Sequence, residues 1–116
     1  MDWQPVIERY ENELTRNVIP FWVKNCVDRE YGGYFTMLDR DGSVYDTTKY
    51  MWMQWRIVYM FAELYRRRCG EGHPEYLEIA RQGFDFLFEH GRTGDGSYYF
   101  ALNREGVPAM AAYSIF

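Results

Sequence analysis

A charged stripe runs through the most apolar stretch of the sequence. Lys49, Arg56 and Glu63 recur at seven-residue spacing, while nearly every other residue between 50 and 65 is apolar. Seven residues make two helical turns, so the three charges are expected to share one side of a helix, with Trp52 between the first two. A buried charge is costly unless it is paired or solvated by a cavity. The stripe therefore indicates a solvated functional centre.

The stretch itself predicts a single helix over residues 47–68. It contains no Gly or Pro and is far too long for an ordinary strand. Asp46, Thr47 or Thr48 is suited to cap its start, and the arginines at 66–68 suit the negative end of its dipole. Because its core is apolar on all sides, we expect an inner helix that neighbours bury on every face.

A helix and a hairpin precede this stretch. Asp2 is suited to cap the helix, Pro5 falls in its first turn, and Pro20 is expected to kink or end it. Its apolar side follows the helical period: Trp3, Val6, Ile7, Tyr10, Leu14 and Val18. Residues 31–46 then predict a short β-hairpin, because two apolar runs flank a turn that ends in Gly42.

The same order of elements follows the stretch. A third helix is expected to open with Pro74 at its first position and to end at Gly91 as C-cap. Its predicted buried side consists of Leu77, Ala80, Phe84, Leu87 and Phe88. A second hairpin covers residues 98–107, and a fourth helix is expected to start near Pro108 or Ala109.

The two hairpins repeat one pattern. Residues 34–42 match residues 98–106 at a constant shift of 64, which also carries Lys49 onto Tyr113. One unit is thus an outer helix, a hairpin and an inner helix, and such units cannot bury their faces alone. We expect the chain to be the N-terminal piece of a longer helical toroid, and to self-associate through exposed helix faces when isolated.

Composition narrows the class of partner. The net charge is −4, and the basic residues form no long stripe apart from 66–68, which argues against nucleic acid. There is no basic-then-apolar leader, and Gln54 and Arg56 interrupt the apolar run, so neither secretion nor membrane insertion is expected. Cys26 and Cys69 lack metal-ligand spacing. The sequence predicts a cytoplasmic protein with reduced thiols, no metal and no cofactor.

Three segments follow one another in the sequence: residues 28–35, residues 38–42 and the Lys-x-x-Trp-x-Gln-x-Arg pattern of residues 49–56. In this order and spacing they resemble the N-terminal region of the N-acylglucosamine 2-epimerase family, which includes cellobiose 2-epimerases and mannose isomerases. Residues 113–116 resemble the start of the family's fourth helix. The resemblance covers nearly the whole chain but only about the first quarter to third of a typical member. It implies an all-α (α/α)6 barrel, of which residues 1–116 would supply three helices, the start of a fourth and the hairpins between helix pairs.

The resemblance also implies a reaction and its site. In this family a base removes the proton at C2 of an open-chain sugar, and the enediolate is reprotonated to the epimer or the ketose. The match places Arg56 as substrate ligand and stabiliser of the developing oxyanion, and Tyr113 in the cavity. The acid/base histidines of the family lie beyond Phe116, so this chain alone is expected to be inactive. Trp55 departs from the pattern, because the residue before the arginine is often small.

Each proposed site residue has a structural alternative. Arg56 is alternatively an ion-pair partner of Glu63, and Lys49 alternatively covers the helix start with its stem. Trp52 is suited to stack on a sugar ring, but core tryptophans are commoner. We nevertheless assign substrate binding to Arg56, Tyr113, Trp52 and Lys49.

Other side chains with catalytic potential have simpler explanations. His73 and His90 stand at a helix start and a helix end, so neither is proposed as a base. Two other functions remain open: a non-catalytic carbohydrate-binding or scaffold piece, and a glycoside hydrolase of the same architecture. A hydrolase needs two carboxylates flanking the scissile bond, and the inner helix offers only Glu63.

Overall fold

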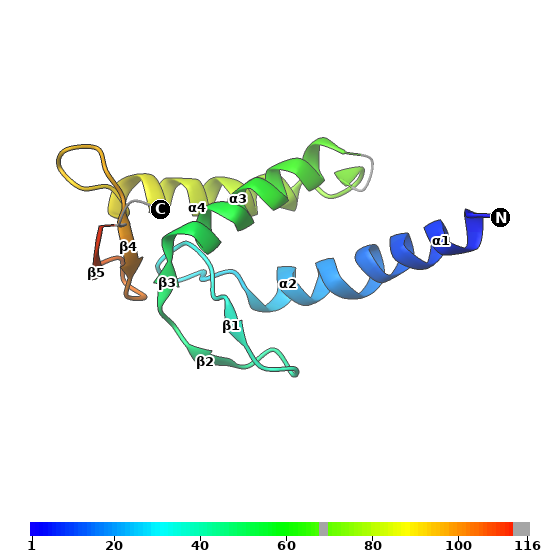
Figure 1. Cartoon of the computed structure of the whole chain (residues 1–116), viewed down its shortest axis with the longest axis horizontal. Helices are drawn as coiled ribbons and strands as arrows, with labels where there is room; N and C mark the ends of the chain where they lie inside the picture. Colours follow the sequence, from blue (N-terminus) through cyan, green and yellow to red (C-terminus); the bar gives the residue numbers. More distant parts are fainter. Residues whose placement is uncertain (68–69, 113–116) are drawn as a thin grey trace.

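The computed structural model describes residues 1–67 and 70–112, which form helices and two small antiparallel sheets (Figure 1). None of the helices in these ranges has the length and apolar character that a bilayer-spanning segment needs. In chain order the elements are α1 (Gln4–Glu13), the π-helical turn η1 (Leu14–Val18), α2 (Ile19–Asn25), β1 (Met37–Leu38), β2 (Val44–Asp46), β3 (Lys49–Tyr50), α3 (Met51–Arg66), α4 (Glu75–His90), β4 (Tyr99–Leu102) and β5 (Pro108–Ala112).

The first helical segment continues past Pro20, where the sequence predicted a kink or an end. Asp2 Oδ1 accepts the Gln4 N–H at 3.0 Å near its start, and α1, η1 and α2 then run on as one rod (Figure 1). Pro20 lies in α2 and does not end it. The N–H of Ile19 reaches back to the Leu14 carbonyl across the wider π turn, and such a turn accommodates the missing donor and the ring of a proline.

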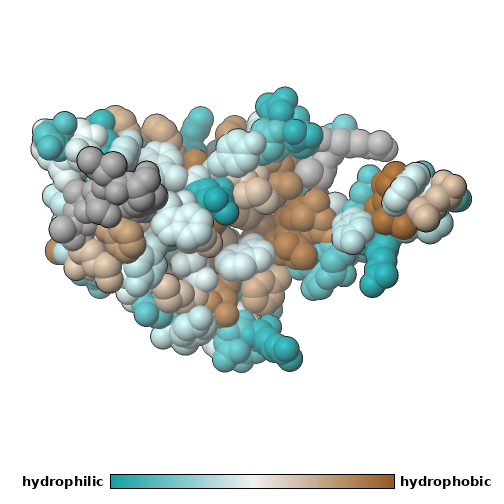
Figure 2. All heavy atoms as spheres, in the orientation of Figure 1, coloured by the Kyte–Doolittle hydropathy of each residue, from teal (hydrophilic) through white to brown (hydrophobic). Residues whose placement is uncertain are grey.

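No residue of α1 is buried. The apolar residues predicted to form its packed side, including Trp3 and Tyr10, are exposed. Figure 1 shows α1 extending away from the other helices, and Figure 2 shows an apolar hollow between this rod and the α3–α4 layer. The hollow is a cavity of about 290 Å³ between α3 and the η1–α2 segment, lined by Leu14, Val18 and Trp22 among others.

The central helix is shorter than predicted. It begins at Met51, because Lys49 and Tyr50 form β3 and pair with Leu102 and Ala101 of β4. The predicted side-chain caps at 46–48 are wrong: Tyr50 occupies the N-cap position and no side chain caps the helix. Lys49 is therefore not part of the helical stripe, and its side chain lies in a different environment from those of Arg56 and Glu63.

The third helix ends at Gly91 as predicted, but it begins at Glu75 with Pro74 as its N-cap. Its predicted buried side is wrong in part, since Phe84 and Phe88 are exposed at 45% and 48%. The buried residues are Tyr76, Ile79, Ala80, Gly83, Phe86 and Leu87. The cause is Gly83: the ring of Tyr34 lies where a side chain at 83 would project, and the Tyr34 hydroxyl donates to the Ile79 carbonyl at 2.7 Å.

The core consists of two clusters of buried residues. The larger one joins the rod, the first hairpin loop, α3 and α4: Ile19, Cys26, Tyr34, Phe61, Leu64, Tyr76, Ile79 and Ala80. The smaller one joins the start of α3 to the end of α4 and to β4: Met51, Phe86, Leu87 and Leu102. Both clusters depend on α3, which is thus the central helix of the described chain.

The predicted repeat is confirmed down to the register of the strands. Leu38 pairs with Val44 in the first hairpin, and Leu102 pairs with Pro108 in the second, so both partners are displaced by 64 residues. The strand register is irregular at the residue before Leu38 and at the residue before Leu102. The turns also correspond, because Gly42 and Gly106 both have a positive φ, of 90° and 98°. Glycine adopts this conformation without the steric cost that a Cβ imposes.

The predicted fourth helix is wrong at its start. Residues 108–112 form β5, which pairs with β4, and the shift of 64 equates Pro108 with Val44 of β2. A proline is tolerated here because it stands at the first position of a strand. Tyr113 and the three residues after it lie outside the described residues.

Candidate functional site

The site begins with a loop that two glutamines hold. Gln54 of α3 is fully buried, and its amide accepts the Tyr34 N–H at 2.9 Å and donates to the Tyr34 carbonyl at 2.8 Å. Gln82 of α4 accepts the Gly33 N–H at 2.9 Å. Buried backbone groups need such partners. The two amides therefore hold the loop of residues 28–34 against α3 and α4.

A buried ion pair fixes the other end of this loop. Lys49 and Asp28 have no exposed side-chain surface, and Lys49 Nζ donates to Asp28 Oδ2 at 2.8 Å. The same nitrogen donates to the carbonyls of Gly32 at 2.7 Å and Arg104 at 2.8 Å. An ammonium has three N–H donors, so all of them are used inside the fold.

Arg104 reaches Asp28 from the second hairpin. Its Nε lies 3.1 Å from Asp28 Oδ2, and its second contact is Glu30 at 3.1 Å. Burial opposes ionisation of Asp28, but hydrogen bonds from Arg104 and Lys49 outweigh it and lower the pKa of the carboxyl. Burial likewise lowers the pKa of Lys49, and the Asp28 carboxylate opposes this effect.

Trp52 and Arg56 lie together on an exposed side of α3. Half of the Trp52 surface is accessible, and the Arg56 guanidinium is 4.9 Å from the centre of its ring, within the range of a cation–π contact. Arg56 also lines the apolar cavity between α3 and the first rod. The pair thus combines a flat apolar surface with a cation at the mouth of an apolar groove.

The alternative partner of Arg56 is engaged elsewhere. Glu63 binds Arg66 at 2.6 Å and Arg67 at 2.7 Å, and these hydrogen bonds lower its pKa to about 2. Within residues 1–67 and 70–112, no acidic side chain forms an ion pair with Arg56. The donors of the guanidinium are thus not used by an acidic side chain among the residues described.

The other predicted site residues fall in different places. Lys49 does not share the exposed side of Trp52 and Arg56, because it lies before α3 and points into the protein. Tyr113 lies outside the described residues. Trp55, which departs from the pattern, packs edge-on against Phe84 at 5.6 Å, and its indole N–H has no partner among the residues described.

The histidines make local contacts. His73 Nδ1 is 2.7 Å from a carboxylate oxygen of Glu75, and the His90 ring packs against Phe86 at 4.9 Å. Burial raises the pKa of the Cys26 thiol to about 12, which makes it unreactive at neutral pH. In the part of the chain that the structure describes, no three His, Cys, Asp or Glu side chains are grouped to hold a metal ion.

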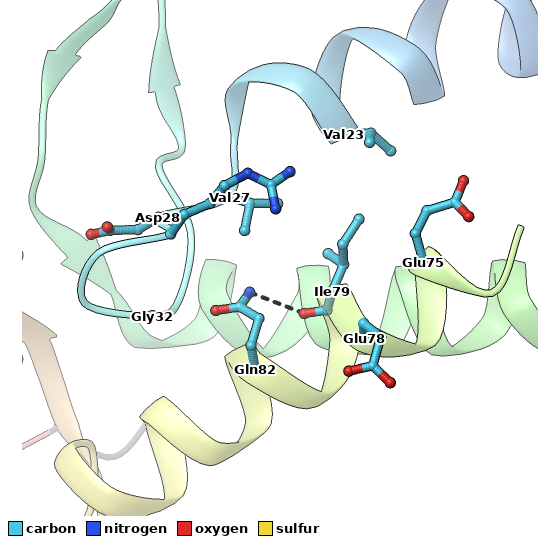
Figure 3. A pocket seen from close by; sticks show the side chains of 9 residues that line it. Val23, Val27, Asp28, Gly32, Glu75, Glu78, Ile79 and Gln82 are labelled. Atoms are coloured by element: carbon cyan, nitrogen blue, oxygen red, sulfur yellow. Dashed lines mark hydrogen bonds between the residues drawn. The ribbon is translucent and has the colours of Figure 1, made fainter.

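A pocket of about 460 Å³, larger than the cavity that Arg56 lines, lies beside the loop of residues 28–34 (Figure 3). Val23 and Val27 line it from the end of α2, and Ile79 and Gln82 line it from α4. The Asp28 carboxylate points away from the two glutamates at the far end of this pocket (Figure 3). Of the predicted site residues that the structure describes, none lines this pocket, so we place the candidate site at Trp52 and Arg56.

Sequence reasoning missed three supporting residues. Asp28 and Gln54 stand within the motifs, but nothing in their spacing shows that one binds Lys49 and the other binds the Tyr34 backbone. Arg104 occupies the same repeat position as Arg40, so the repeat predicts a turn residue. Its contact with Asp28 joins residues far apart in the sequence, and no local pattern encodes such a contact.

Comparison with known proteins assigns the family. The profile of the N-acylglucosamine 2-epimerase (GlcNAc 2-epimerase) family matches residues 33–116, which include α3 and both hairpins. The chain belongs to this family. The resemblance inferred from the motifs is thereby confirmed.

Members of the family with similar sequences come from animals and bacteria. The chain is 42% identical to the mouse N-acylglucosamine 2-epimerase over 111 residues, and it covers 26% of that protein. It is 27% identical over 103 residues to the cellobiose 2-epimerase of Bacteroides fragilis, again covering 26%. The chain thus spans about a quarter of the length of the curated relatives it matches.

Solved structures of the epimerase family share the arrangement of these elements. The cellobiose 2-epimerase of Bacillus thermoamylovorans superimposes with a TM-score of 0.79 at 28% identity, over 92% of this chain and 27% of that one. A D-mannose isomerase superimposes with a TM-score of 0.72 at 28% identity, over 84% and 24%. The helices, hairpins and loop described above are therefore a partial region of the epimerase fold.

Proposed function

We propose that the chain is the N-terminal part of a sugar 2-epimerase or aldose–ketose isomerase. In this proposal, residues 1–116 begin a single (α/α)6-barrel domain, and α3 is an inner helix that lines its sugar-binding cavity. The observation that carries the proposal is the Trp52–Arg56 pair. It is exposed on a central helix, beside buried residues of the same motif, and its cation has no acidic partner among the residues described.

Arg56 would act on charge that develops during proton transfer. Removal of the C2 proton from an open-chain sugar places negative charge on the oxygens at C1 and C2. The planar guanidinium of Arg56 donates to such an oxygen, and Trp52 supplies an apolar face for the sugar. No acidic side chain of the described residues pairs with Arg56, and the two histidines contact Glu75 and Phe86. We therefore assign the proton acceptor to later helices and propose that Tyr113 joins the site from the next one.

The experiment is exchange of the sugar C2 proton in deuterated water, followed by NMR. The complete protein that carries this chain is expected to exchange the C2 proton of N-acetylglucosamine, N-acetylmannosamine, mannose, glucose or cellobiose. Residues 1–116 alone are expected to exchange none of them. No exchange by the complete protein with any of these sugars would contradict an epimerase and favour the non-catalytic sugar-binding alternative.

The uncovered side of α1 supports a further part of the proposal. Its exposed residues, such as Trp3 and Tyr10, are those that a toroid would cover with another helix. We expect residues 1–116 alone to associate with a second copy through this side. Light scattering at micromolar concentration tests this, and a sharp monomer peak with cooperative melting would contradict it.

A further inference from the structure

The start of α3 is held by its surroundings rather than by a cap. The first N–H groups of a helix have no partner within it, and a side chain at the N-cap usually binds one of them. Tyr50 stands at this position in an extended conformation and provides no such bond. The helix therefore depends on the two residues of β3, Lys49 and Tyr50, for its position.

Lys49 connects β3 to two other segments. Its ammonium binds Asp28 and the Gly32 carbonyl in the loop, and it binds the Arg104 carbonyl in the turn of the second hairpin. It also lies 4.4 Å from the centre of the Phe86 ring on α4. One buried side chain thus contacts the loop of the first unit, the turn of the second unit and the second outer helix.

Arg104, whose side chain is partly exposed, also binds Asp28. Its side chain binds Asp28 while its own carbonyl accepts from Lys49, and its guanidinium lies 5.1 Å from the Tyr31 ring centre. Asp28 is thereby shared by a lysine before α3 and an arginine in the second hairpin. A shift of either hairpin would break a contact to a fully buried carboxylate, which is strongly unfavourable.

We propose that Lys49 is a positioning residue for Trp52 and Arg56. Trp52 follows Lys49 by three residues and Arg56 follows it by seven. Only Tyr50 separates Lys49 from the start of α3, which contains both side chains. When the Lys49–Asp28–Arg104 anchor holds β3, it also fixes the direction in which both side chains leave α3. This role replaces direct substrate contact as the function of Lys49, and its catalytic part rests on the proposed function.

The experiment measures the position of Trp52 separately from activity. The complete protein is labelled with 5-fluorotryptophan, and the Trp52 signal is assigned in the ¹⁹F NMR spectrum with the variant Trp52→Phe. Lys49→Met removes the anchor while keeping the length of the side chain. Lys24→Met is the matched control, because Lys24 is the other lysine of the chain and is exposed on α2.

In Lys49→Met we expect the Trp52 signal to shift or broaden while the Trp3 signal stays unchanged. We also expect kcat for epimerisation to fall roughly 10- to 100-fold with a smaller change in KM, because misplacement of a group that acts in the transition state lowers turnover. Lys24→Met is expected to change neither quantity.

Each other outcome has a defined meaning. A lower melting temperature with an unchanged Trp52 signal and unchanged kcat of the folded protein would overturn the positioning role. If the wild-type protein epimerises no sugar, the proposed function fails, while the ¹⁹F spectrum still decides the position of Trp52. If Lys49→Met does not fold, it is replaced by Asp28→Asn and by the double variant Asp28→Asn/Lys49→Met, because neither contains an unpaired buried carboxylate. The same changes in the Trp52 signal and in kcat are then expected for these variants.

Discussion

The Lys-x-x-Trp-x-Gln-x-Arg motif divides into two pairs with opposite environments. Lys49 and Gln54 have no exposed surface, and each of their polar groups binds the loop of residues 28–34 or the turn after β4. Trp52 and Arg56 lie on an exposed side of the same helix and contact each other. One motif thus supplies both the support of the helix start and the candidate site beside it.

The difference shows how position along α3 separates structure from function. A buried polar group is retained when every donor and acceptor is satisfied, as for Gln54 and the Tyr34 backbone. An exposed arginine without an acidic partner gains little for the fold. Substitutions should therefore have different consequences. We expect mainly a loss of stability for Gln54 and a direct loss of activity for Arg56, while Lys49 should affect turnover through the position of Trp52 and Arg56.

The largest expected effect is that of Arg56→Ala on turnover. If Arg56 stabilises the enediolate oxygen, kcat of the complete protein should fall roughly 100- to 1,000-fold, as for loss of an oxyanion donor. Arg56→Lys should recover only part of it, because an ammonium does not reproduce the planar, two-pronged donor. Steady-state kinetics and thermal melting are measured on the same preparations.

The matched control is Arg81→Ala, because Arg81 is an exposed arginine on a different helix, α4, and does not line the cavity that Arg56 lines. It should leave both turnover and melting unchanged. Near-normal turnover of a destabilised Arg56→Ala protein would show that Arg56 is a structural residue and would remove it from the site.

A smaller effect is expected for Gln54→Leu, and it should appear in stability. Leucine leaves the buried N–H and C=O of Tyr34 without partners, at roughly 1 to 3 kcal/mol for each group. Urea unfolding measures this loss, with Gln4→Leu as the control because Gln4 is exposed at the start of α1. Equal midpoints for the two variants would mean that the loop does not need the Gln54 amide.

The elements that sequence patterns predicted well depend on local chemistry. Both hairpins follow from turn residues and from the shift of 64, because Gly42 and Gly106 supply the positive φ that these turns require. The C-terminal end of α4 follows from Gly91 as the predicted C-cap residue, although its φ of −86° lies in the ordinary helical region. The exposed Trp52–Arg56 side of α3 was predicted as a polar stripe, since spacing alone places residues four apart on one side of a helix.

The elements that were mispredicted depend on tertiary contacts. Pairing with β4 takes Lys49 and Tyr50 out of the helix, although both residues are compatible with one. The ring of Tyr34 against Gly83 turns α4, so that Phe84 and Phe88 are exposed instead of Tyr76 and Phe86. Because aromatic residues occupy both faces of α4, the pattern of apolar residues alone does not show which face is buried.

The smallest expected effect is the contribution of Asp28 to acid stability. Its pKa in the folded protein is lowered from the ordinary value of 3.8, so the folded state binds fewer protons than the unfolded state below that value. The stabilisation is complete well above pH 3.8 and is lost as the pH falls through the lowered pKa. Urea unfolding at a series of pH values from neutral to acidic measures this loss.

Other carboxyls, including that of Glu63, also have lowered pKa values and lose their stabilisation over the same acid range. The contribution of Asp28 is therefore the difference between the profiles of the wild type and Asp28→Asn. Because an asparagine side chain does not ionise, this difference should be largest near neutral pH and should shrink as the pH falls below 3.8. A Glu63→Gln variant should leave the midpoints at neutral pH nearly unchanged, because its ion pairs with Arg66 and Arg67 are solvent-screened. A constant difference between wild type and Asp28→Asn at every pH would mean that the carboxylate charge of Asp28 does not hold the loop, and the anchor would then be reduced to its hydrogen bonds.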